Sequence, residues 1–199
     1  LSDNEGTLSV LGSSVRLDRS MLAAYPHLEK LNAKKGGALN IEGLAYDHSN
    51  RSLLIGLRSP LSNGDALIAE LLNPDEIFRS SAAPEFAPSL ISLPLDKGGI
   101  RAMEFDKTLG GFIMVSRRET KKKKPWKLWC WPSDRSSPPK RIKAVSASLL
   151  ERVEGVASYR PPGGADAGLL FVRDDGDFKK RRGARYFFSS YKTLGGVCQ

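Results

Sequence analysis

Short apolar runs separated by turn-forming residues dominate the chain, and the same arrangement of three runs occurs three times. The first runs lie at 41–47, 100–106 and 153–159, the second at 52–58, 111–117 and 168–173, and the third at 66–71, 126–131 and 185–190. Runs of this length, rich in aliphatic and aromatic residues and bounded by Gly, Pro, Asn or Asp, are typical of β-strands. The pattern therefore predicts three antiparallel meanders.

The copies form an internal repeat with units near 41–72, 99–132 and 153–191. Aligning them places Glu42, Arg101 and Glu154 at one equivalent position, with separations of 59 and 53 residues. Small meanders bury their faces by stacking side by side, as the blades of a propeller do. We therefore predict an all-β fold in one domain over 1–199, a partial or small β-propeller-like array of antiparallel meander blades.

The segments outside the repeat predict further elements. Residues 1–40 are expected to hold a strand at 7–11 and a short helix at 20–31, which Pro26 must start or kink. Residues 73–87 have the composition of a surface excursion, and 90–95 is expected to add an outer strand ahead of the second unit. Aromatic side chains of the third runs sit at strand spacing and are expected in the core: Trp126, Trp129, Trp131, Tyr186 and Phe188.

Four segments in order along the chain carry a family resemblance: Pro26-His27-Leu28, Leu39-Asn40-Ile41-Glu42-Gly43-Leu44-Ala45, Leu54-Ile55-Gly56-Leu57-Arg58-Ser59-Pro60 and Gly98-Gly99-Ile100-Arg101. Over residues 20–180 the sequence resembles a bacterial, β-propeller-like family, domain of unknown function family 3616. The resemblance implies a propeller and no established activity. Members of that family are usually longer, so three units are expected to form only part of a closed ring. Ser59 and the segment 116–119 depart from the family pattern, and the lysine-rich blocks lie outside the resemblance.

The Glu-Gly opening of the first and third units is also similar to that of gluconolactonase-like and phytase-like propellers. In those proteins such a glutamate can hold a divalent cation at the central channel. This similarity implies calcium or another divalent cation, with Glu42, Glu154, Asp174 and Asp175 as oxygen ligands. Asp174-Asp175-Gly176-Asp177 is more typical of a tight turn than of a calcium loop, because its spacing is not that of a helix-loop-helix site.

In a propeller the innermost strands line the channel, so Glu42, Arg101 and Glu154 are expected to converge near the axis. One interpretation is a structural ion-pair cluster, with the arginine between two carboxylates. A second is a ligand site that Arg58 completes, since an arginine ends the second run of each unit. The third is the cation site, against which Arg101 argues because it competes for the same carboxylates.

The net charge of +9 is concentrated in two blocks, and removing their eight charges leaves +1. Both blocks lie between the second and third runs of a unit, so they are expected to form a basic rim that binds phosphate-rich ligands or nucleic acid, or to be solvated hairpin loops. The blocks are Lys121, Lys122, Lys123, Lys124 and Lys179, Lys180, Arg181, Arg182.

Other chemistries lack the residues that they need. Two cysteines make no disulfide framework, and Cys130 is expected to be a small core residue. Two histidines offer no base for a nucleophile, and no phosphate-binding glycine loop occurs. No apolar run is long enough to insert in a membrane, so a cytoplasmic or periplasmic protein is expected.

The sequence thus predicts a domain that binds a small anionic ligand or a protein at its central channel or basic rim. The alternative is a metal-dependent hydrolase of the lactonase or phytase-like type. An incomplete ring would also favour a homo-oligomer.

Overall fold

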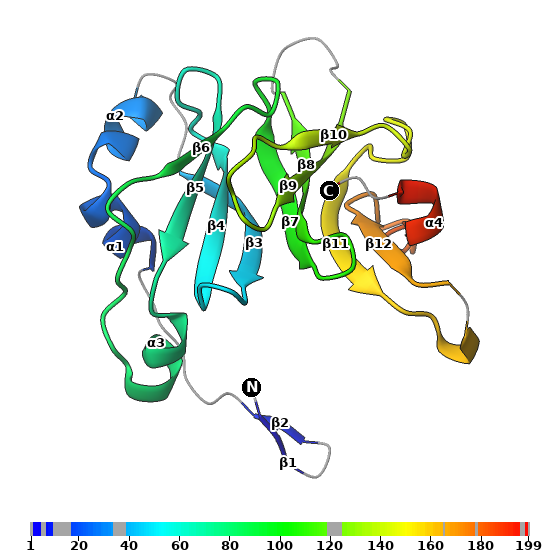
Figure 1. Cartoon of the computed structure of the whole chain (residues 1–199), viewed down its shortest axis with the longest axis horizontal. Coiled ribbons are helices and arrows are strands. Elements are labelled where there is room, and N and C mark those ends of the chain that lie inside the picture. Colours follow the sequence, from blue (N-terminus) through cyan, green and yellow to red (C-terminus); the bar gives the residue numbers. More distant parts are fainter. Residues whose placement is uncertain are drawn as a thin grey trace.

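Three antiparallel sheets form the framework of the computed structural model, which describes residues 2–4, 7–9, 17–33, 39–118, 125–164, 166–177, 179–195 and 198. The sheets follow one another along the chain and lie side by side in Figure 1. Each is a meander, in which consecutive strands pair with their neighbours. They do not form a closed propeller.

All nine predicted strands are present. The first sheet contains β3 (Asn40–Asp47), β4 (Ser52–Ser59), β5 (Ala66–Leu71) and β6 (Ile91–Leu93). The second contains β7 (Gly99–Asp106), β8 (Gly111–Arg117), β9 (Lys127–Pro132) and β10 (Lys140–Ile142), and the third β11 (Val153–Tyr159), β12 (Gly168–Arg173) and β13 (Tyr186–Ser190). The outer strand expected at 90–95 is β6, whereas β10 was not predicted because three polar or charged residues surround its single buried Ile142.

Shorter elements flank the sheets. They are the hairpin β1 (Ser2–Asn4) and β2 (Thr7–Ser9), the helices α1 (Leu17–Ala24), α2 (His27–Ala33), α3 (Pro74–Ser80) and α4 (Tyr191–Leu194), and the 3-10 turn η1 (Pro162–Gly164). The single helix predicted at 20–31 is wrong: Pro26 lacks the N–H that would continue the first helix, so two helices form. The surface excursion predicted at 73–87 contains α3. Pro74 is the first residue of this helix, where the missing N–H of proline removes no helical hydrogen bond.

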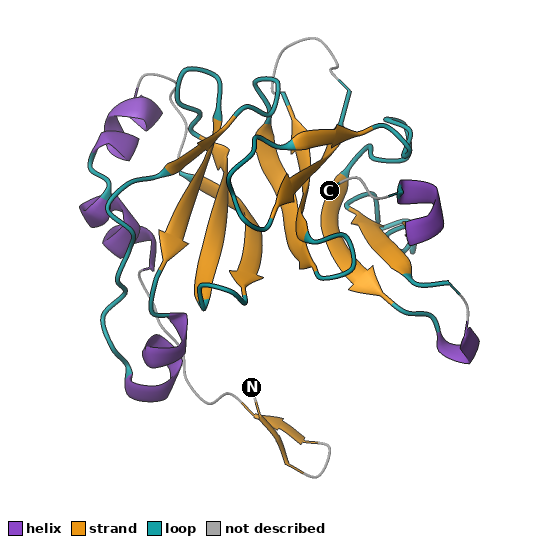
Figure 2. Cartoon of the chain, in the orientation of Figure 1, coloured by secondary structure: helices purple, strands orange, loops and turns teal. Residues whose placement is uncertain are grey.

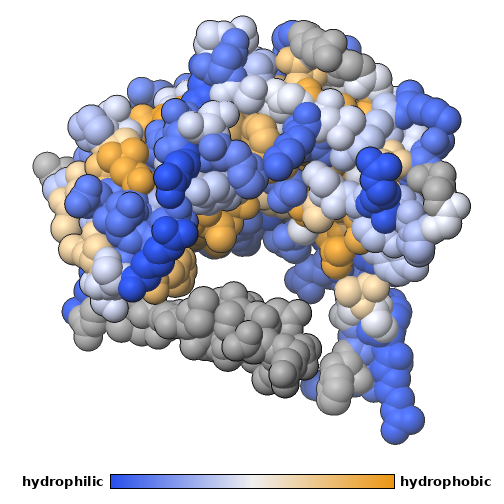
Figure 3. Space-filling model, turned by 60° about the horizontal axis from the view of Figure 1, so that its bottom comes forward, coloured by the Kyte–Doolittle hydropathy of each residue, from blue (hydrophilic) through white to orange (hydrophobic). Residues whose placement is uncertain are grey.

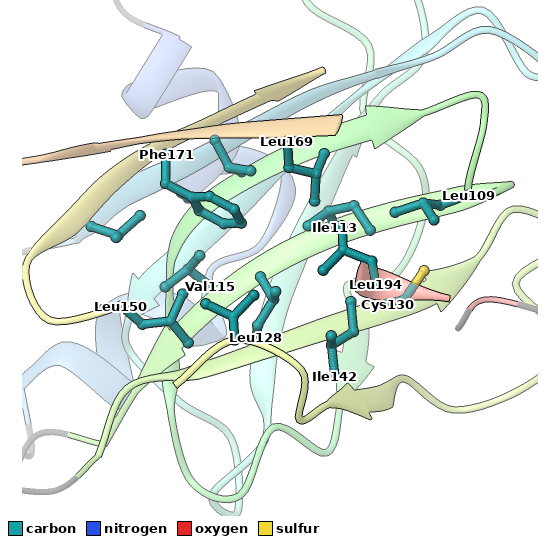
Figure 4. Packing of buried hydrophobic residues seen from close by; sticks show 14 of the residues in the cluster. Leu109, Ile113, Val115, Leu128, Cys130, Ile142, Leu150, Leu169, Phe171 and Leu194 are labelled. Atoms are coloured by element: carbon teal, nitrogen blue, oxygen red, sulfur yellow. The ribbon is translucent and has the colours of Figure 1, made fainter. Parts of the chain in front are cut away.

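The sheets pack face to face, with β7 lying against β3 on one side and β11 on the other. Alternation along β8 serves both contacts: Phe112 and Met114 join the core shared with the first sheet, while Ile113 and Val115 join the core shared with the third. Figure 4 shows this second core, in which Ile113 and Val115 lie beside Leu169 and Phe171 of β12. The second sheet is therefore buried on both faces.

The outer faces of the first and third sheets differ. Helices cover the first, where Met21, Tyr25 and Leu28 pack against Ile55 and Leu57 (Figure 2). No described element covers the outer face of the third sheet.

Two aromatic predictions are therefore wrong. Trp126, Trp129 and Trp131 are buried as expected, but Tyr186 is 73% exposed and Phe188 38% exposed. Their strand spacing is right, but the face on which they lie has no partner. On the side of the molecule drawn in Figure 3, hydrophobic side chains gather in small areas between mainly hydrophilic ones.

The prediction that Cys130 is a core residue is confirmed, since it is fully buried, but its bond to a second cysteine was not foreseen. Cys130 on β9 forms a disulfide with Cys198, with 5.4 Å between the two Cα atoms. The bond ties the C-terminal end of the chain to the core between the second and third sheets, where both cysteines are buried. Two cysteines 68 residues apart carry no spacing signal, so only the fold brings them together.

Candidate functional site at the start of the innermost strands

The equivalent residues of the three units meet in one ion-pair chain. Arg101 lies between two carboxylates: its Nε is 3.0 Å from Glu42 Oε2, and its Nη2 bonds Glu154 Oε1. The sequence prediction that Glu42, Arg101 and Glu154 converge agrees with this geometry. The three residues meet because they lie near the start of β3, β7 and β11, the strands through which neighbouring sheets contact one another.

Arg58 extends this chain, as its Nη1 donates to Glu42 Oε1 at 2.6 Å. The cluster is only partly closed to solvent, because the side chains of Arg101, Arg58 and Glu154 are 8%, 27% and 31% exposed. Burial raises the pKa of the Glu154 carboxyl, and the ion pair with Arg101 only partly opposes this. The charges of this cluster are largely paired, which favours its interpretation as a structural ion-pair cluster.

Three arginines end the second strands of the units, and their surroundings differ. Arg58 pairs with Glu42 of its own sheet, and Arg173 pairs with Asp175, at 3.3 Å between Nε and Oδ2. Arg117 is the equivalent residue of the second sheet, where Arg101 stands in place of the glutamate. Among the residues that the structure describes, Arg117 has no carboxylate partner, and its Nε is buried without a hydrogen bond.

The ring of Trp126 positions both arginines of the second sheet. The guanidinium carbon of Arg101 lies 5.1 Å from its centroid and that of Arg117 lies 5.3 Å away, both within the range of cation–π attraction. Trp126 itself is 5% exposed. Its indole is therefore a buried support for two cations, and it connects the ion-pair chain to Arg117.

A pocket of about 370 Å³ opens beside Arg117. Its wall comes from the end of β8, the start of β9 and the turn that leads into β11. Its lining includes two arginines, one glutamate and the hydroxyl of Ser148. The lining residues are Arg117, Pro125, Trp126, Ala147, Ser148, Glu151 and Arg152.

The predicted cation ligands fall into separate groups. Glu42 and Glu154 are joined through Arg101, whereas Asp175 bonds Arg173 and Arg185. The hydrogen bond from the backbone of Arg185 lowers the pKa of Asp175, and the side chain of Arg185 adds to this effect. Within the described ranges, no three His, Cys, Asp or Glu side chains lie close enough to hold a metal ion.

The predicted basic rim is described only in part. Lys121, Lys122, Lys123 and Lys124 lie outside the described residues. Lys179, Lys180, Arg181 and Arg182 are exposed in the turn between β12 and β13, where Lys180 pairs with Asp177 at 3.6 Å.

A second buried arginine was not predicted. Arg135, in the loop after β9, reaches back to the first sheet and bonds Asp47, with Glu70 bound through both of its terminal nitrogens at 2.9 and 3.0 Å. Burial alone would raise the pKa of these two carboxyls, but the hydrogen bonds they accept outweigh it and lower both pKa values. Arg135 lies in a proline- and serine-rich loop, so no sequence pattern marks it as the partner of these carboxylates.

No known protein family, curated protein or solved structure matches the chain. None of the described helices is long and apolar enough to cross a membrane. The pocket beside Arg117 is thus interpreted from its own chemistry.

Proposed function

We propose that this chain is a ligand-binding protein that holds a small anionic ligand in the pocket beside Trp126, with Arg117 as the principal contact. One observation carries the proposal. Position 101 carries an arginine where the equivalent positions of the other two units carry a glutamate. Arg101 therefore pairs with two carboxylates in neighbouring sheets, and Arg117 has no carboxylate partner among the described residues. The guanidinium of Arg117 can therefore take an anion from the pocket that it lines.

The way in which Arg117 is held supports this role. The cation–π contact with Trp126 restrains the Arg117 side chain, so less side-chain freedom is lost when it binds a carboxylate or phosphate. Charge-assisted hydrogen bonds to a planar guanidinium are among the stronger polar contacts in proteins. Arg152 and Ser148 line the same pocket and supply a second cation and a hydroxyl.

The size of the pocket limits the ligand. At about 370 Å³ it lies at the lower end of the range of small-molecule sites. A pyrophosphate, a citrate or a compact phosphorylated metabolite fits that volume and charge. A ligand with an aromatic ring is not favoured, because Arg101 and Arg117 already occupy positions over the Trp126 ring.

The site belongs to a propeller-like arrangement, which we also propose. Supporting it are the face-to-face packing of consecutive meanders and the contact of each innermost strand with the next, β3 with β7 and β7 with β11. Figure 1 shows these three strands running in the same direction. An innermost position for β3, β7 and β11 accounts for the meeting of Glu42, Arg101 and Glu154.

Isothermal titration with pyrophosphate and with citrate tests the proposal. We expect saturable binding by the unaltered chain and at least tenfold weaker binding by Arg117→Gln, since one charge-assisted hydrogen bond contributes about 1.5–3 kcal/mol. Arg160→Gln is the matched control, because Arg160 is an exposed arginine beyond the end of β11, and its affinity should be unchanged. Equal affinities of Arg117→Gln and the unaltered chain, or no saturable binding of either anion, would contradict the proposal.

A further inference from the structure

The pocket beside Arg117 adjoins two others around the first residues of β9. The second pocket, of about 250 Å³, shares Trp126 and Ala147 with it, and the third, of about 270 Å³, shares Pro125. The second and third pockets share Lys127. The three pockets therefore follow one another around the start of this strand, and we call them together the basic groove.

Strand order explains why cations gather in the basic groove. β8 ends at Arg117, β9 begins at Lys127, and β10 ends one residue before Lys143, so three neighbouring strands reach one edge of the second sheet. Neighbouring strands lie about 4.8 Å apart, which places a row of basic residues along this edge. Arg152 joins them from the turn that leads into β11.

The basic groove has an excess of positive charge. Among its described lining residues, the carboxylates are those of Asp96 and Glu151. Asp96 pairs with Lys127 at 2.6 Å between Oδ2 and Nζ, and this hydrogen bond lowers the pKa of Asp96. Six cations against two carboxylates leave four positive charges. The cations are Arg117, Arg118, Lys127, Arg141, Lys143 and Arg152.

Most of these cations are open to a ligand. Like charges held close together repel one another and destabilise the folded chain. An anion with several charges removes this repulsion by lying between the cations, whereas a single phosphate reaches only those of one pocket. Four of the cations are exposed and, in the described part of the chain, form no ion pair with a carboxylate: Arg118, Arg141, Lys143 and Arg152.

We infer that the basic groove binds linear polyphosphate, a step that rests on the proposed anion site at Arg117. One phosphate lies on Arg117, and neighbouring units lie along Arg141 and Lys143. Polyphosphate carries negative charge on every unit and has no apolar part, which matches a row of cations. Each further pocket that the chain reaches strengthens binding, because the second contact of a tethered ligand is intramolecular.

The basic groove lacks the surface that single-stranded nucleic acid uses. Bases stack on exposed aromatic side chains. Of the described residues that line the three pockets, Trp126 is the one aromatic, and the guanidinium groups of Arg101 and Arg117 lie over its ring. The groove thus offers contacts to phosphates but no stacking surface for bases.

Isothermal titration with pyrophosphate and with linear polyphosphate of about fifteen units, both in about 0.15 M salt, compares one pocket with the whole groove. We expect the longer chain to bind at least about a hundredfold more tightly. The number of ways of placing two phosphates on such a chain accounts for only about tenfold of this gain. Arg117→Gln should weaken the binding of both anions.

The double variant Arg141→Gln/Lys143→Gln removes two cations from the second pocket. It should weaken the binding of the longer chain by about tenfold or more and leave the affinity for pyrophosphate unchanged. Lys179→Gln/Arg181→Gln is the matched control, because it removes the same charges from the exposed turn between β12 and β13. The control should change neither affinity by more than about twofold, since charges distant from the groove are screened in this salt. Thermal unfolding verifies that both variants are folded.

The outcomes separate the polyphosphate site from the anion site on which it rests. Pyrophosphate binding that depends on Arg117, with no gain for the longer chain, overturns the polyphosphate site and leaves the proposed function standing. No saturable binding of either anion overturns both. Equal weakening by the two double variants overturns the polyphosphate site, since the contact would then be diffuse charge. Tighter binding of polyuridylate than of polyphosphate of the same length also overturns it, since the groove would then favour nucleic acid.

Discussion

Arg135 is a charged residue whose loss should be costly for the stability of the fold. It joins the first and second sheets by contacting Asp47 and Glu70, whose side chains are 2% and 12% exposed. Its guanidinium also lies 5.8 Å from the Trp131 ring centroid. Removing it leaves two buried carboxylates without their cation.

We therefore expect Arg135→Met to lower the free energy of unfolding by about 3 kcal/mol, in the range measured when one partner of a buried ion pair is removed. Urea denaturation near pH 7 measures the change. Arg51→Met is the control, because Arg51 is exposed and pairs at the surface with Asp75, and its denaturation curve should overlay that of the unaltered chain. Equal effects of the two substitutions would show that the Arg135 bridge is not buried in the way described.

Glu104 gives the chain a distinct pH dependence. Burial raises the pKa of its carboxyl and the charge of Asp106 adds to this, while hydrogen bonds from Ser158 and the proximity of His48 oppose it. Because the pKa is higher in the folded state, the folded chain binds a proton that the unfolded chain releases. The stability from this group is complete below the ordinary pKa of glutamate, about 4.3, and is lost as the pH rises through the raised value.

Glu104→Gln should accordingly raise the melting temperature at pH 7, because the glutamine cannot carry the charge that burial disfavours. Its advantage should shrink as the pH is lowered below the ordinary pKa of glutamate, about 4.3, because the unaltered side chain is then protonated in both states. Calorimetry between pH 7 and pH 4 compares the two chains. A difference in melting temperature that stays constant over this range would mean that Glu104 titrates with the same pKa in the folded and unfolded states.

At the scale of elements, close approach of neighbouring sheets limits substitution. β7 begins against the end of β4, and a Cβ added at Gly99 would overlap the backbone carbonyl of Arg58. Gly99→Ala should therefore destabilise the fold by about 2 kcal/mol, a typical cost of overpacking. Gly183→Ala, where a Cβ meets open space, should be nearly neutral in the same urea titration. A Gly99→Ala chain as stable as Gly183→Ala would contradict the packing of β7 on β4.

The disulfide joins elements that are distant in sequence. A closed loop of this length, 68 residues, contributes about 4 kcal/mol in the chain-entropy treatment. A reductant should lower the urea midpoint of the unaltered chain toward that of Cys198→Ser, whose own midpoint should not respond to reductant. Identical midpoints with and without reductant in the unaltered chain would show that the two cysteines are not bonded in solution.

The sequence predicted the strands well because each has a local signal. Apolar runs and hairpin residues place β3, β4 and β5 and their equivalents to within a residue or two. The repeat also brought Glu42, Arg101 and Glu154 together, since equivalent positions of stacked units lie side by side. The pattern also marked Arg117, with the other arginines that end the second runs, as a candidate contact for an anion. It did not show that Arg117 differs from Arg58 and Arg173 in its ion pairs, and it gave no role for Arg135, because these depend on which carboxylate each one reaches in another part of the fold.

The exposure of Tyr186 and Phe188 shows a second limit of sequence reasoning. Their spacing on β13 is that of core residues, and the same spacing on β9 does bury Trp129 and Trp131. Whether a sheet face is covered depends on what packs against it, and a strand pattern holds no information about the neighbouring layer.

At the scale of the whole molecule, the arginines make a structural cation unnecessary. Arg101 and Arg58 together balance the charges of Glu42 and Glu154. Asp175 pairs with Arg173 and Arg185. We expect neither calcium nor a chelator to shift the melting temperature by more than the experimental error. A rise with calcium that a chelator reverses would instead support the metal-dependent hydrolase.

The central claim is that an exogenous anion binds Arg117, and an anomalous-scattering anion locates that contact directly. A crystal soaked in tungstate should show an anomalous peak within hydrogen-bonding distance of the Arg117 guanidinium, on the side of the pocket that Ser148 and Arg152 line. An empty pocket, with the anion found only at the exposed turn that carries Lys179 and Arg182, would contradict the account.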